Sequence, residues 1–165
     1  MTQVYTAGPF FNEQQEKHAI ELASKLRERG FGVYAPVEHK YEEQKSNATE
    51  IFMRNIKWMF NADILLFQLD YPMDDGEQLI LRSPIDGDEN VSLPDSGTVW
   101  EMGYGYCLRR VRECRLIGYH TLPVQNLNLM LAQCLDGIAE NLWDVFLPDG
   151  KLDLTALTDF SGRQI

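Results

Sequence analysis

The sequence has few cysteines, few histidines and no long hydrophobic run, and each shortage excludes a class of protein. Its three cysteines form no CxxC pair and its three histidines are scattered, which argues against a disulfide framework and against a zinc site. No apolar stretch approaches the length of a membrane span, and the first residues lack the features of a signal peptide. We expect a cytoplasmic protein with reduced thiols, no membrane partner, no metal and no cofactor.

Basic residues are also scarce, since 15 lysines and arginines stand against 25 acidic residues, a net charge of -10. This balance opposes binding to nucleic acid, because phosphate contacts need a clustered basic surface. The one local exception is the run of Arg109, Arg110, Arg112 and Arg115. We interpret this run as the positive end of a helix, which the helix dipole favours, in preference to a phosphate site.

The hydrophobic pattern predicts one α/β domain that spans residues 1–165. Short apolar strands are expected at residues 3–7, 31–35, 62–70 and 114–119, and helices at 13–29, 50–61 and from 95 to 112. Residues 138–146 are expected to hold a short helix and a last strand, the strand at 143–146. Strands that alternate with helices indicate a flavodoxin-like three-layer sandwich with a roughly five-stranded, mainly parallel sheet.

Two polar segments interrupt this pattern. Residues 37–48 follow the second strand, at the edge where ligands bind in such sheets. Residues 71–93 form the longest irregular segment. The first fits either a loop that lines a pocket or a solvated loop. The second fits either a lid or binding loop or a disordered segment, and the sequence leaves these interpretations open.

The stretch PDSGTVWEMGYG, residues 94–105, places a single carboxylate, Glu101, about one turn inside a small, apolar helix start. Asp95 or Ser96 serves as the helix cap, and Gly97 permits a tight turn. Glycines are unfavourable in a helix, so they indicate the close approach of another group. That group is either a ligand, with Glu101 as a functional residue, or the sheet, with Glu101 simply favoured by the helix dipole.

Four motifs, in order, give the chain a resemblance to a known family. They are YTAGPFF after the first strand begins, NADILLF in the central strand, PDSGTVWEMGYG at the helix start, and NLNLM after the fourth strand. Together they resemble the nucleoside 2-deoxyribosyltransferases, over residues 3–130. The most specific feature is an aspartate and a glutamate separated by five residues, with a glycine shortly after the aspartate.

The resemblance implies a role for five residues. Glu101 stands at the position of the nucleophile that attacks C1′ of a deoxynucleoside, and Tyr5 at that of the tyrosine that orients it. Asp63 corresponds to the aspartate that protonates the leaving base, although a charge at a strand start also fits a cap for the preceding turn. Asp95 corresponds to the residue that holds the 5′-hydroxyl. Asn128 corresponds to an asparagine donated to a neighbouring subunit, which implies a dimer or a hexamer.

The same resemblance implies which residues form the walls of the pocket. Gly8, Phe10 and Gly97 are expected to contact the substrate, with Phe10 as an aromatic wall. Trp58, expected to be half buried, and Trp100 fit either stacking on a base or packing in the core, which is the more common place for aromatic side chains at such spacings. The segment from Glu38 to Lys40 lacks the amide side chain that the family often presents to the base, so base preference is left open.

The expected activity is transfer of 2-deoxyribose between nucleobases through a covalent ester on Glu101, chemically akin to a retaining glycosidase. The expected partners are a deoxynucleoside and a free nucleobase. Two alternatives stay open: hydrolysis of deoxynucleosides or their 5′-monophosphates, and nucleotide binding without catalysis. Asp95 favours unmodified nucleosides, because a carboxylate repels a phosphate and accepts a hydrogen bond from a hydroxyl.

Overall fold

A five-stranded parallel sheet forms the centre of the protein in a computed structural model that describes residues 1–40, 47–72, 80–82, 90–92, 94–122, 126–160 and 163–164. Its strands lie in the order β2-β1-β3-β6-β8 and every neighbouring pair is parallel. The strands are β1 (Gln3–Ala7), β2 (Gly32–Tyr34), β3 (Ile64–Gln68), β6 (Arg115–Tyr119) and β8 (Gly137–Ala139). Counted along the chain the order is 2-1-3-4-5, which is flavodoxin-like and confirms the predicted fold class.

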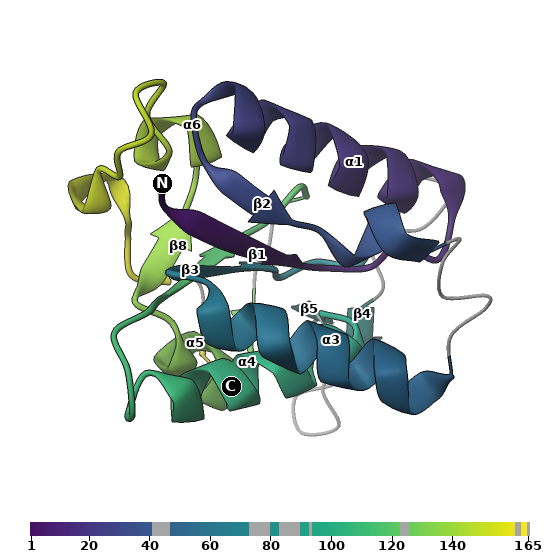
Figure 1. The fold of residues 1–165 in the computed structure, drawn as a ribbon. Helices are drawn as coiled ribbons and strands as arrows, with labels where there is room; N and C mark the ends of the chain where they lie inside the picture. The colour runs from purple at the N-terminus through teal and green to yellow at the C-terminus, as the bar shows by residue number, and fades with distance from the viewer. Residues whose placement is uncertain are drawn as a thin grey trace.

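Helices cover both faces of this sheet (Figure 1). One face carries α1 (Glu13–Glu28) and α6 (Leu142–Val145), and the other carries α3 (Ala48–Asn61), α4 (Ser96–Leu108) and α5 (Leu129–Cys134). Two 3-10 helices, η1 (Pro36–His39) and η2 (Leu154–Ala156), follow β2 and α6. Two further strand pairs are β4 (Ile80–Arg82) with β5 (Asn90–Ser92), antiparallel, and β7 (Asn126–Leu127) with β9 (Arg163–Gln164), parallel.

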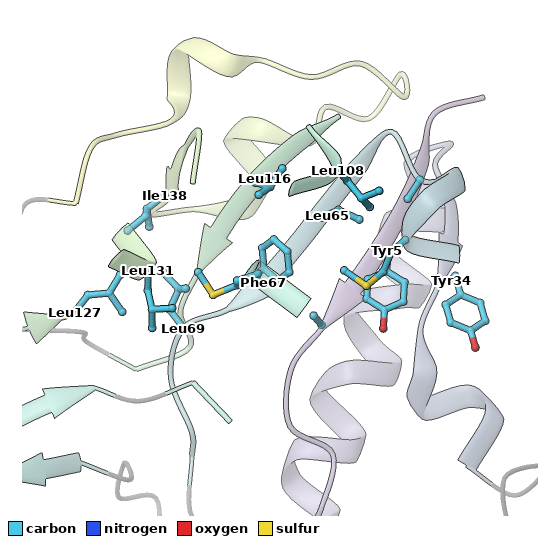
Figure 2. Packing of buried hydrophobic residues seen from close by; sticks show 14 residues of the cluster. Tyr5, Tyr34, Leu65, Phe67, Leu69, Leu108, Leu116, Leu127, Leu131 and Ile138 are labelled. Atoms are coloured by element: carbon cyan, nitrogen blue, oxygen red, sulfur yellow. The ribbon is translucent and has the colours of Figure 1, made fainter. Parts of the chain in front are cut away.

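The central strand β3 is buried along its whole length, as its continuous apolar sequence predicts for a strand covered on both faces. Leu65 and Phe67 pack in the cluster beneath α3, α4 and α5, part of which is drawn in Figure 2. Ile64 and Leu66 point the other way, into the cluster that includes residues of α1 and α6. The alternation along one strand therefore joins both layers of the core.

Two predicted boundaries need correction. Residues 143–146 were expected to form the last strand, but they lie in and just after helix α6, which Asn141 caps by accepting a hydrogen bond from Trp143 N at 3.1 Å. The fifth strand of the sheet is β8 instead. The helix expected to reach residue 112 ends at Leu108, and Arg112 turns back to donate to Ala62 O at 2.6 Å.

Several predictions fall wholly or partly outside the described residues. Residues 41–46 of the polar segment after β2 and most of the irregular segment 71–93 belong to this group. Within the irregular segment, the described residues Ile80–Arg82 form the short strand β4. Within the described ranges, no helix has both the length and the apolar character needed to cross a bilayer.

Candidate active site

A cavity of about 170 Å³ lies at the carboxyl end of β1, beside α3 and the start of α4. It is next to the point between β1 and β3 where the strand order reverses, the usual position of a ligand in an open parallel sheet. Its described lining consists of Ala7, Gly8, Phe10, Phe11, Pro36, Asn55, Asp95, Gly97, Thr98 and Glu101. Five predicted site residues therefore meet in one cavity.

The two residues predicted as nucleophile and orienting tyrosine are in direct contact. The Tyr5 hydroxyl donates a hydrogen bond of 2.5 Å to Oε1 of Glu101. Tyr5 is fully buried in β1, and its ring stacks on that of Tyr34 in the neighbouring strand β2, with centroids 5.8 Å apart. Figure 2 shows these two rings side by side. A rigid strand therefore fixes the hydroxyl that holds the carboxylate.

The carboxyl group of Glu101 is electrostatically unusual. Its pKa is raised from 4.5 to about 7: removal from water is the largest cause, the Tyr5 hydrogen bond opposes the rise, and the negative charge of Asp95 adds to it. A carboxylate with a pKa near neutrality is typical of catalytic acids, bases and nucleophiles. This group therefore changes charge in the physiological range.

Asp95 caps the helix that carries Glu101. Its side chain accepts hydrogen bonds from Gly97 N at 2.8 Å and from Thr98 N at 3.2 Å, and its second oxygen accepts one from the Thr98 hydroxyl. Asp95, not Ser96, is thus the cap. These bonds fix the direction of α4 and hold the Asp95 carboxylate at the cavity wall.

Glycine occurs at different positions of α4 for different structural reasons. A Cβ atom at Gly105 would lie 2.7 Å from Leu65 Cδ1, so this glycine lets the helix approach the sheet. At Gly103 a Cβ would meet no atom within 4 Å among the described residues. Gly8, at the end of β1, is required by Gln68, whose Oε1 would lie 2.9 Å from a Cβ there. Sheet packing thus explains Gly105.

Asp63 lies away from this cavity. It precedes β3, at the amino edge of the sheet, where its Oδ2 accepts a hydrogen bond from Gln3 N at 2.8 Å. It lines a different cavity of about 610 Å³, together with Thr2 and Arg110. This position does not agree with the predicted contact to the leaving base, whereas it fits the alternative prediction that Asp63 ties down the start of the strand.

The arginine run occupies the same amino edge. Arg109 caps the end of α4 and lies 3.6 Å from Asp136, which also lies 3.7 Å from Arg115. Arg110 donates to the Tyr106 hydroxyl at 2.8 Å. The last turn of α4 contains no basic residue, and Arg109, its C-cap, is the member of the run that lies at the end of the helix as predicted.

The remaining predicted residues lie outside the cavity. Asn128 caps α5, accepting a hydrogen bond from Met130 N at 2.9 Å, and is exposed. Trp58 stacks on Tyr34 with centroids 4.7 Å apart, but 39% of its surface is exposed. Trp100 is 47% exposed and stacks on Tyr104. Trp58 is thus partly buried, in line with the expected half burial, whereas Trp100 lies at the surface and not in the core.

Sequence reasoning missed two polar residues of the cavity. Thr98 is buried and bonded to Asp95, and its position three residues after a helix cap signals this contact. Asn55 comes from α3, and no motif distinguishes it from the other polar residues of that helix. Its role depends on how α3 is rotated against the sheet.

Known proteins resemble this chain in sequence and in fold. The family model for nucleoside 2-deoxyribosyltransferase matches residues 4–125. A solved structure of the 2-deoxyribosyltransferase from Bacillus psychrosaccharolyticus aligns with a TM-score of 0.58 and 22% identity, over 92% of this chain and 99% of that one. A 2-desoxiribosyltransferase from Leishmania mexicana aligns with a TM-score of 0.50 and 19% identity, over 98% of this chain and 89% of that one. No curated protein sequence matches the chain. The family match covers most of the chain, and the chain therefore belongs to the nucleoside 2-deoxyribosyltransferase family.

Proposed function

We propose that this protein transfers 2-deoxyribose from a deoxynucleoside to a free nucleobase through a covalent ester on Glu101. The observation that carries this proposal is the Tyr5–Glu101 pair, a carboxylate held by a buried hydroxyl at the wall of a cavity. Family membership supports the reaction class. The raised pKa of the Glu101 carboxyl group, about 7, adds support, since shifted pKa values cluster at catalytic sites.

In the first half-reaction, Glu101 attacks C1′ of the deoxynucleoside. Tyr5 engages Oε1, so Oε2 is the oxygen that forms the new bond. The N-glycosidic bond breaks, its electron pair stays on the base nitrogen, and the departing base takes up a proton from solvent. The sugar passes through an oxocarbenium-like state that a nearby carboxylate stabilises. The product is a deoxyribosyl ester of Glu101 and a free base.

In the second half-reaction, a ring nitrogen of the incoming base attacks C1′ from the side that the first base vacated. The ester bond breaks, Glu101 recovers its carboxylate, and the new base loses its N–H proton. Two displacements at one carbon give net retention of configuration. Apolar walls at Ala7, Phe10 and Pro36 favour a base over water as the acceptor.

The position of Asp95 favours a substrate that carries a free hydroxyl group at C5′ of the sugar. Its carboxylate lies in the cavity wall with Glu101, and its negative charge adds, after burial, to the raised pKa of Glu101. A third negative charge from a 5′-phosphate would add repulsion, whereas a hydroxyl donates a hydrogen bond. Deoxynucleosides are therefore the proposed substrates in preference to their monophosphates.

We also propose that the active form is a homo-oligomer, a dimer or a hexamer, in which Asn128 completes the site of a neighbouring subunit. Asn128 is exposed and lies outside its own cavity, and two exposed apolar residues follow it, Leu129 at 47% and Met130 at 71%. Phe52 and Trp100 form a second exposed aromatic pair, with ring centroids 5.3 Å apart. Light scattering during size-exclusion chromatography tests this proposal, and a monomer that is fully active contradicts it.

The decisive assay incubates the protein with 2′-deoxyinosine or thymidine, with and without adenine as acceptor, and separates the products by chromatography. Formation of 2′-deoxyadenosine only with both protein and adenine supports transfer. Release of free base and deoxyribose without a new nucleoside supports hydrolysis instead. Intact-mass measurement with donor alone should show one added deoxyribosyl group, which E101A should lack.

A further inference from the structure

Among the described residues that line the cavity, one polar side chain belongs neither to helix α4 nor to its cap. Of its described lining, Asp95, Thr98 and Glu101 come from α4 and are bonded to Tyr5 or to one another. Asn55 comes from α3. The amide therefore faces the ligand space from a different helix.

The direction of the displacement places the leaving base toward the walls that α4 does not form. The bond to a leaving group lies on the far side of C1′ from the attacking oxygen. With Glu101 attacking from α4 and Asp95, the cap of that helix, holding the sugar, the base would extend toward the part of the described lining that α4 does not form. Asn55 is the polar side chain in that part of the lining.

A hydrogen-bonded chain orients the Asn55 amide. Arg54 Nε donates to the Tyr34 hydroxyl at 2.9 Å, and this hydroxyl donates to Asn55 Oδ1 at 3.3 Å. An arginine nitrogen can only donate, so the Tyr34 hydrogen is directed to Oδ1. The amide Nδ2–H groups are then the part of Asn55 that is presented to a ligand.

The tyrosine that orients Asn55 is itself held rigidly. Tyr34 is 4% exposed and lies opposite Tyr5 in the β1–β2 register. Its ring is nearly parallel to that of Trp58, with an interplanar angle of 8°. The same stack of rings thus positions the hydroxyl on Glu101 and the amide of Asn55.

We propose that Asn55, positioned by Tyr34, recognises the nucleobase by donating a hydrogen bond from Nδ2 to a carbonyl oxygen or ring nitrogen of the base. This inference rests on the proposed deoxyribosyl transfer. As the glycosidic bond breaks, its electron pair spreads onto these acceptor atoms, and the hydrogen bond strengthens in the transition state. An amide cannot give up a proton at neutral pH, so the departing base takes its proton from water.

The rate of the first half-reaction should therefore depend on which base leaves. With a neutral donor in place of a carboxylic acid, bases that carry negative charge well should leave faster than bases that do not. Asp63, the residue predicted to supply an acid, lies at the other edge of the sheet and does not change this expectation.

The test compares kcat/KM for a series of 2′-deoxynucleosides whose bases differ in acidity. The variants are N55A, N55D and Y34F, with N61D as a matched control at the last residue of the same helix, outside the cavity. N55A should lower kcat/KM by roughly 10- to 100-fold, the loss expected for one directed hydrogen bond to developing charge. Y34F should change the ratios among donors in the same direction by less, and N61D should leave them unchanged.

The N55D variant tests directly whether the side chain at position 55 contacts the leaving base. A carboxylic acid at this position should speed poor leaving bases relative to good ones and should turn a single acid limb into a bell-shaped pH profile. If N55A and N55D, folded as judged by circular dichroism, keep the wild-type ratios among donors to within twofold, the inference is overturned.

The wild-type assay separates this inference from the proposed function. If the wild-type protein transfers deoxyribose, the variant ratios decide the role of Asn55. If it does not, the proposed function fails, and calorimetric binding of free hypoxanthine to wild-type protein and to N55A decides the role of the amide. Equal affinity of the two proteins, or no binding to either, then overturns it.

Discussion

The Tyr5 hydroxyl and the Glu101 carboxylate, 96 positions apart in the chain, meet in a hydrogen bond of 2.5 Å at the carboxyl edge of the sheet. Tyr5 belongs to a strand and Glu101 to a helix, so the contact depends on how closely α4 packs on the sheet. Burial raises the pKa of the glutamate and the hydroxyl lowers it, and these opposing effects set the value near 7. The pair therefore links core packing to the charge of the reactive group.

The pH dependence of activity should follow the charge of Glu101. Only the carboxylate attacks C1′, so kcat/KM should rise with pH and level off above about 7, the pKa of this group. Below that value the rate should fall by about tenfold per pH unit. Initial rates in buffers from acid to mildly alkaline pH measure this, and a flat profile through neutrality would show that another step limits the rate.

Two substitutions should shift this acid limb in opposite directions. Y5F removes a hydrogen bond that lowers the pKa of Glu101, so the limb should move to higher pH. D95N removes a negative charge that raises this pKa, so the limb should move to lower pH, while asparagine still caps the helix. The measurement is the midpoint of the pH profile for each variant. Shifts of the same sign would contradict this account of the electrostatics.

The same carboxylate should make the folded protein less stable as the pH rises. In the folded state the pKa of Glu101 is about 7, above its ordinary 4.5, so the folded protein binds the proton more tightly and loses stability as pH rises between these values. E101Q should therefore be more stable than wild type above pH 7, by an amount on the order of 2–3 kcal/mol. Urea denaturation at pH 5 and pH 8 measures the difference.

The matched control for that experiment is E113Q, which changes an exposed glutamate after the end of α4. It should give nearly the same stability as wild type at both pH values. An E101Q gain that is equally large at pH 5 would point to packing instead of charge.

The fold could be predicted because local signals were sufficient, whereas the pairing of Tyr5 with Glu101 was an expectation from the family resemblance. A continuous apolar run marks β3 as the central strand, and the cap at Asp95 sets where α4 begins, which brings Glu101 to the cavity. Helix α6 could not be distinguished from a strand, because its four residues are too few to show either the helical or the strand periodicity of apolar residues.

Asp63, which was predicted at the site, and Asn55, which was not, show which parts of the candidate site could not be predicted from the sequence. Asp63 precedes β3, and the start of a parallel strand lies at the edge opposite to the carboxyl ends, so sequence adjacency to the central strand was misleading. Asn55 lies on a helix, where contact with the cavity depends on rotation and tilt against the sheet. Those quantities arise from long-range packing, which one sequence does not encode in a readable pattern.

The last prediction concerns two glycines of α4 that differ only in what lies beside them. G105A should destabilise the protein by about 1–3 kcal/mol, because the added Cβ would lie 2.7 Å from a side-chain atom of Leu65 and would force the helix away from the sheet. G103A should stabilise it by about 0.5–1 kcal/mol, because this exposed position has room and alanine favours the helix. Thermal and urea denaturation measure both effects. Since Gly105 lies one turn after Glu101, G105A should also lower activity by weakening the Tyr5 contact, whereas G103A should leave activity unchanged. A G105A protein as stable as G103A would show that the close approach of α4 to the sheet is not what requires glycine there.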